Sequence, residues 1–99
     1  MVVDPHFPTC PIRNVLSRLC GADALWVINV LAENVSATME VLCREMRGLN
    51  YQQIASAIRI LMEDRIVEKS SNGYRLSPLG KSLLPSLKGI EGWCEMQIK

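Results

Sequence analysis

Long apolar runs and a large excess of charge of either sign are both missing from this sequence of 99 residues. No run of about 18 apolar residues occurs, so we expect no membrane-spanning segment and no membrane partner. The opening residues MVVDPHFP lack a basic region followed by an apolar stretch, so we expect a cytoplasmic protein without a secretory signal. Because the formal net charge is only +1, any binding to nucleic acid has to come from a local basic patch.

Residues suited to catalysis or metal binding are also scarce. His6 is the only histidine in the sequence. Successive cysteines among the four are separated by 10, 23 and 51 positions, and no C-x-x-C pair occurs. Zinc sites are usually built from closely spaced ligand pairs, so we expect no metal. No serine or cysteine has a base at helical spacing, and no glycine-rich phosphate loop occurs. We therefore expect neither an enzyme nor a bound cofactor.

The apolar pattern predicts one domain in which helices come first. A helix is expected to begin at Pro11, a favourable first-turn residue, and a second over 22–32, whose all-round apolar sequence indicates a buried central helix. The polar connector AENVSAT then leads to the short helix MEVLCREM and the turn RGLN. The next helix is expected to begin at Asn50, which forms a capping-box pattern with Gln53.

A β-hairpin and a last helix are predicted to follow. The pair Asn72-Gly73 predicts a two-residue type I′ turn, because both central positions of that turn need a positive φ. Ser77-Pro78 is a start signal for the last helix. Pro85 and two later glycines predict that this helix kinks or breaks.

This order of elements is typical of a winged helix-turn-helix, in which two helices joined by a short turn precede a tight hairpin. We therefore predict an α+β, mostly helical fold, with a generic small α+β domain as the alternative. The expected parts are a flexible arm over 1–9, the helix-turn-helix over 38–64, the wing over 66–76 and a C-terminal helix over 78–97.

Three stretches, TCPIRNVLSRL, LNYQQIASAIRILMEDRIVEK and YRLSPLGKSLLPSL, resemble the HxlR-type winged helix-turn-helix transcriptional regulators. The resemblance implies a homodimer built from N- and C-terminal helices that binds operator DNA, and a thiol sensor at the entrance cysteine in some members. The sequence departs from that family in three places. Asp23 and Ala24 replace a basic–aromatic pair, KSSNGY forms a short wing, and Arg65 stands where glycine is common.

The second helix of a helix-turn-helix reaches base edges with its N-terminal residues. Glutamine can pair with adenine through two hydrogen bonds, and serine can contact several bases. The predicted base-reading residues are Tyr51, Gln52, Gln53 and Ser56. The predicted contacts to the DNA backbone are Arg44, Arg47, Arg59, Lys69 and Arg75. As alternatives, Arg59 forms a salt bridge with Glu63 four residues on, and the other cations are ordinary solvated surface.

Cys10 is the candidate for a redox-sensing thiol. It precedes Pro11 at the expected start of a helix, where the positive end of the helix dipole and nearby Arg13 favour the thiolate. The alternative is that Cys10 only packs at a dimer interface. Cys20 and Cys43 lie on apolar faces, so we expect them to be buried and unreactive.

Both ends of the sequence contain more apolar residues than one small core can cover. Exposed apolar stripes mark interfaces, and two-fold symmetry is the commonest solution, so we expect a homodimer. Its partner is expected to be double-stranded DNA with an inverted-repeat operator, which makes the protein a transcriptional regulator. The alternative is an interaction or dimerisation module with weak or no DNA binding. The residues behind the dimer prediction are Ile12, Val15, Leu16, Leu19, Leu84, Leu87, Ile90 and Trp93.

Overall fold

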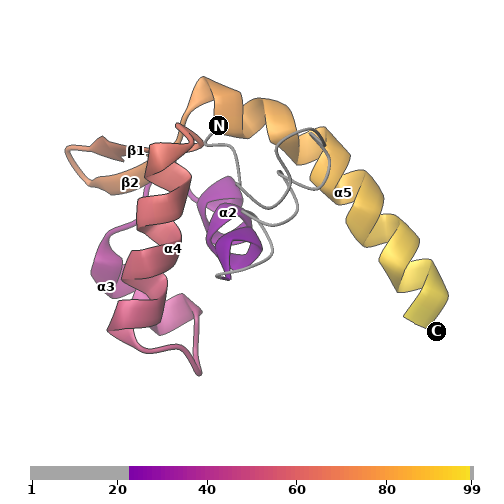
Figure 1. Cartoon of the computed structure of the whole chain (residues 1–99), viewed down its shortest axis with the longest axis horizontal. Coiled ribbons are helices and arrows are strands. Elements are labelled where there is room, and N and C mark those ends of the chain that lie inside the picture. Colours follow the sequence, from indigo (N-terminus) through magenta and orange to yellow (C-terminus); the bar gives the residue numbers. More distant parts are fainter. Residues whose placement is uncertain (1–22, 99) are drawn as a thin grey trace, which may run out of the picture.

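The computed structural model describes residues 23–98, and within them the predicted order of elements is present (Figure 1). The helix expected from Pro11, the arm over 1–9, Cys10 and Cys20 lie outside the described residues. The described elements are α2 (Ala24–Glu33), α3 (Met39–Glu45), α4 (Tyr51–Glu63), β1 (Val67–Ser70), β2 (Gly73–Leu76) and α5 (Pro78–Ile98).

Helix α2 lies at the centre of the domain and packs against α4, β2 and the first part of α5 (Figure 1). Its buried residues are Ala24, Val27, Ile28, Val30 and Leu31. The prediction of a buried central helix is therefore confirmed for the face that these residues form. The opposite side is open, since Trp26 is 40% exposed.

Helices α3 and α4 form the predicted helix-turn-helix, and both begin at side-chain caps. Thr38 Oγ1 accepts a hydrogen bond from the Val41 N–H at 3.2 Å. Asn50 Oδ1 accepts from the Gln53 N–H, and Gln53 Oε1 accepts from the Asn50 N–H, each at 2.9 Å. The predicted capping box is confirmed. The inward face of α4 consists of Ile54, Ala57, Ile58 and Leu61, all buried.

The wing is a two-stranded antiparallel hairpin whose turn lies one residue earlier than predicted. Ser70 pairs with Gly73, so Ser71 and Asn72 are the central turn residues, and neither has a positive φ. The predicted turn centred on Asn72-Gly73 is therefore wrong. Gly73 has φ 118°, and a Cβ atom there would overlap the carbonyl oxygen of Ala37. Glycine is needed at this position because another backbone segment approaches it closely.

That segment is the polar connector between α2 and α3, which pairs with the wing. The Ala37 N–H donates to the Tyr74 carbonyl and the Tyr74 N–H donates to the Ala37 carbonyl, each at 2.8 Å. Ala37 is buried. The connector therefore anchors the wing to the helix-turn-helix through a single antiparallel bridge.

Ser77 caps the start of α5 and ties it to the segment between α4 and β1. Its Oγ accepts from the Gly80 N–H at 3.0 Å and donates to the Arg65 carbonyl at 2.5 Å, with the Ile66 carbonyl at 3.1 Å. A kink or a break was predicted in α5. The helix is continuous through Pro85, so it does not break, and Figure 1 shows that it changes direction along its course. No helix in residues 23–98 is both long enough and apolar enough to cross a membrane.

The two halves of α5 differ in burial. Leu87 is buried and Leu84 half-buried against the core of the same protomer, so these two residues do not belong to an exposed stripe. Farther along, Ile90, Trp93 and Met96 are 55%, 62% and 73% exposed. Figure 1 shows this distal half running away from the rest of the domain.

Candidate nucleic-acid interface

The exposed side of α4 contains all four predicted base-reading residues. Tyr51, Gln52, Gln53 and Ser56 are exposed, and they lie in the first two turns of the helix. The buried side of the same helix fixes its rotation, so these side chains point away from the core. The N-terminal half of α4 therefore presents these four side chains on the surface.

The two glutamines are not equivalent. A two-bond contact to adenine uses both the oxygen and the nitrogen of the side-chain amide. Gln53 already uses its Oε1 to accept from the Asn50 N–H, so such a contact would break the capping box. Gln52 makes no hydrogen bond to any residue in the described part of the chain, and its whole amide is available.

Two of the five cations that were predicted to contact the DNA backbone are already in ion pairs with glutamates. Arg59 Nη1 lies 3.0 Å from Glu63 Oε1, which confirms the salt bridge considered as the alternative for this residue. Arg75 Nε lies 2.9 Å from Glu68 Oε1, its neighbour across the hairpin. Both pairs are exposed, so each contributes little to stability, but each cancels one positive charge on this surface.

The other three cations are exposed and belong to no ion pair within residues 23–98. Arg44 lies in the last turn of α3, Arg47 follows in the turn before α4, and Lys69 lies on β1. Lys69 is directly opposite Tyr74 in the strand register. Alternation along the strands places both on the same face of the hairpin as Val67 and Leu76, whose side chains are buried.

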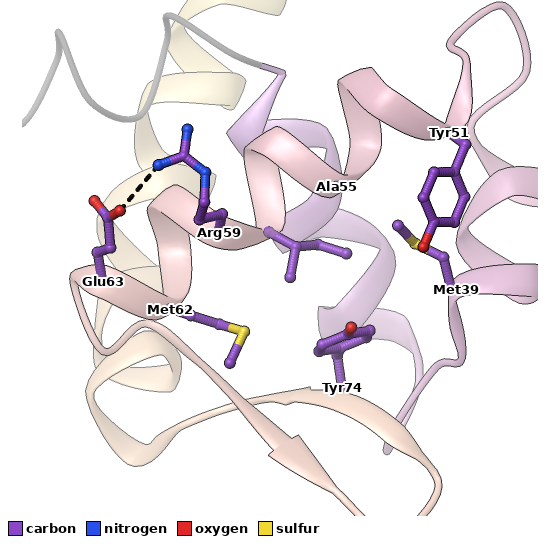
Figure 2. Close-up of a pocket in the computed structure, with 8 residues that line it drawn as sticks. Met39, Tyr51, Ala55, Arg59, Met62, Glu63 and Tyr74 are labelled. Carbon is purple, nitrogen blue, oxygen red and sulfur yellow. Dashed lines mark hydrogen bonds and ion pairs between the residues drawn. The ribbon is translucent and has the colours of Figure 1, made fainter.

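An open groove of about 450 Å³ lies between α4, the wing and the start of α3 (Figure 2). Its walls are mostly apolar or aromatic, with the Arg59–Glu63 pair at one edge. Figure 2 shows the Tyr51 and Tyr74 rings projecting into it from α4 and from β2. Tyr74 was not among the predicted site residues. The lining residues are Met39, Tyr51, Ala55, Ile58, Arg59, Met62, Glu63 and Tyr74.

Within the described residues, no group of three histidine, cysteine, aspartate or glutamate side chains is close enough together to hold a metal ion. Cys43 is half-buried in α3 rather than fully buried as predicted, and Cys94 is exposed on α5. The sensor candidate Cys10 lies outside the described residues, so its role stays a prediction.

Known structures share this architecture. The quinone-bound YodB from B. subtilis superposes with a TM-score of 0.80 at 19% identity, over 88% of this chain and 99% of that chain. A protein from Enterococcus faecalis V583, described as a transcriptional regulator of the MarR family, superposes with a TM-score of 0.79 at 22% identity. That match covers 99% of this chain and 92% of the other. The fold is a winged helix-turn-helix.

At these identities the likeness establishes the fold alone. No model of a known protein family matches the sequence, and no curated protein matches it. The winged helix-turn-helix is nevertheless complete within residues 23–98, with α4 as the second helix of the helix-turn-helix and β1–β2 as the wing.

Proposed function

We propose that this winged helix-turn-helix is a sequence-specific, DNA-binding transcriptional regulator of the HxlR type that acts as a homodimer. The observation that supports this most strongly is the exposed N-terminal half of α4, on a helix that also packs against a hairpin wing. The fold likeness to a described MarR-family regulator supports the same conclusion. In this proposal α4 enters the major groove, and two-fold symmetry places the two copies of α4 about 34 Å apart on an inverted repeat.

Bases and phosphates would be contacted by different parts of the surface. Gln52 and Ser56 are the best-placed base-reading residues because both are exposed on α4 and neither side chain has a hydrogen-bond partner in the described residues. The three cations outside ion pairs, Arg44, Arg47 and Lys69, would contact phosphates. Cys10 is proposed to make the regulator responsive to oxidants or electrophiles, as the resemblance implies.

Gln52→Ala should weaken binding to the cognate duplex by about 1–3 kcal/mol and leave binding to a scrambled duplex almost unchanged, because it removes a base contact. Gln53→Ala should instead lower the free energy of unfolding by about 1 kcal/mol, because it removes half of the capping box. Titrations on both duplexes, combined with urea unfolding of each variant, separate the two roles. Equal losses on both duplexes for Gln52→Ala would show that α4 does not read bases.

Lys69→Ala should weaken binding to cognate and scrambled duplexes alike and flatten the salt dependence, since a phosphate contact contains no sequence information. Arg75→Ala should have a smaller effect, because Arg75 is paired with Glu68. Glu68→Gln should raise affinity by releasing Arg75, and the gain should vanish in the variant Glu68→Gln/Arg75→Gln. Titrations at two salt concentrations measure these effects, and a gain that persists in the double variant contradicts the pairing argument.

The ion pairs of Arg59 with Glu63 and of Arg75 with Glu68 also favour a second candidate function, a winged-helix module for protein interaction or dimerisation. Each pair removes a cation from the surface that would meet phosphates. The two functions differ in one respect that can be measured. Only the regulator should prefer particular duplex sequences.

A further inference from the structure

We propose that the groove between α4 and the wing binds the sugar–phosphate backbone of DNA, and that the hydroxyls of Tyr51 and Tyr74 both donate hydrogen bonds to phosphate oxygen there. This inference rests on the proposed function and extends it. It adds Tyr74 of the wing to the interface. It also assigns Tyr51, predicted above to contact bases, to the backbone.

The two tyrosine hydroxyls are the polar groups in this groove that have no hydrogen-bond partner among residues 23–98. Arg59 and Glu63, the charged residues at its edge, pair with each other at 3.0 Å. Neither tyrosine hydroxyl makes a hydrogen bond to the rest of residues 23–98, and Tyr51 is 59% exposed while Tyr74 is half-buried. A phenolic hydroxyl has one hydrogen to donate. Two such donors facing one hollow, as Figure 2 shows, suit a ligand with several acceptor oxygens.

The position of the groove favours the DNA backbone as that ligand. One wall is the recognition helix and the other is the wing, so a strand of DNA that both elements contact would pass between them. Half to two-thirds of protein–DNA hydrogen bonds go to phosphate and sugar, and tyrosine is among the usual donors. Met39, Ala55 and Met62 offer apolar surface that suits the C–H groups of deoxyribose.

Charge on the wing agrees with an anionic occupant. Lys69 lies opposite Tyr74 on the same face of the hairpin, it is exposed, and it has no ion pair within the described residues. The paired Arg75 and Glu68 lie on the other face. This face of the wing therefore has an available cation at the strand position opposite Tyr74, which would favour an anion bound to Tyr74.

The test uses Tyr51→Phe and Tyr74→Phe in the full chain, because each substitution removes one oxygen and keeps the ring. Each variant should bind a duplex selected by the wild type about fivefold or more weakly, with the same loss on a scrambled duplex. The selected duplex is then scanned with single methylphosphonates, which neutralise one phosphate at a time. At one position per half-site, the methylphosphonate should weaken wild-type binding and have a smaller effect on the Tyr74→Phe variant.

The outcomes distinguish this inference from the proposed function. If the wild type prefers some duplexes but both phenylalanine variants bind like the wild type, the groove does not hold the backbone and the regulator proposal is unaffected. A loss confined to the selected duplex would assign the tyrosines to base contacts and overturn the inference. The inference is also overturned if every methylphosphonate weakens the wild type and the Tyr74→Phe variant equally. It is overturned too if the variants lose binding only to a protein partner or to a small aromatic ligand. A wild type that shows no duplex preference contradicts the proposed function, and the inference fails with it.

Discussion

Replacing both Ile90 and Trp93 with aspartate is expected to convert a dimer into a monomer and to weaken binding to an inverted-repeat duplex by about 10²–10⁴-fold. These two residues are 55% and 62% exposed on the distal half of α5, and Met96 beside them is 73% exposed. Clustered apolar side chains of this size mark an interface. Buried carboxylates at such an interface would oppose association, and a monomer could occupy only one half-site.

Light scattering at micromolar concentration and titration on the full and half operator measure the two effects. Lys88→Gln, on the same helix, is a control that should leave the dimer intact, because Lys88 is exposed and helical spacing places it on the side of α5 away from Ile90 and Trp93. A wild-type protein that is monomeric at micromolar concentration, or a doubly substituted protein that stays dimeric, would contradict the assignment of this interface.

Gly80→Ala is expected to have the largest effect on stability, lowering the free energy of unfolding by about 3 kcal/mol. A Cβ atom at Gly80 would overlap the backbone carbonyl oxygen of Ile66. That carbonyl also accepts from the Ser77 N–H at 2.9 Å, so the start of α5 cannot move away without losing its cap. The same contact explains the glycine in the sequence SPLG.

Gly92→Ala provides the matched control within the same helix. No atom lies within 4 Å of a Cβ built at Gly92, so alanine there should stabilise the protein by about 0.5–1 kcal/mol through its higher helix propensity. Urea unfolding of the two variants should therefore give shifts of opposite sign. Shifts of the same sign would show that the packing of α5 on Ile66 is not what requires glycine at position 80.

Elements defined by local signals were predictable from the sequence. The capping box at Asn50 and Gln53 and the i, i+4 pair of Arg59 and Glu63 need only residues within one turn of helix, and both are present. The buried face of α4 follows in the same way from the i, i+3, i+4, i+7 spacing of its apolar residues. The order of elements could therefore be derived without any knowledge of tertiary contacts.

Features that depend on distant backbone contacts were missed. The predicted turn would have placed Arg75 opposite Ser70, whereas the observed turn places it opposite Glu68. This one-residue error hid the wing ion pair, and the turn itself is set by the contact between Gly73 and Ala37, which has no local signal. The groove and the role of Tyr74 depend on the same docking of the wing, so neither could be derived from spacing.

The residue that follows Asp64 at the end of α4 has a left-handed backbone. The φ of Arg65 is 62°, in the region that glycine adopts without strain. This backbone conformation costs a non-glycine residue about 1 kcal/mol. The turn after α4 therefore has a conformation that glycine favours, although arginine occupies the position.

Selection of duplexes from a random pool by the purified wild-type protein tests whether α4 reads a DNA sequence. We expect enrichment of an inverted repeat whose half-sites lie one helical turn apart, and loss of that enrichment in Gln52→Ala. A pool that stays unenriched, or one in which Gln52→Ala selects the same repeat as the wild type, would contradict this role of α4.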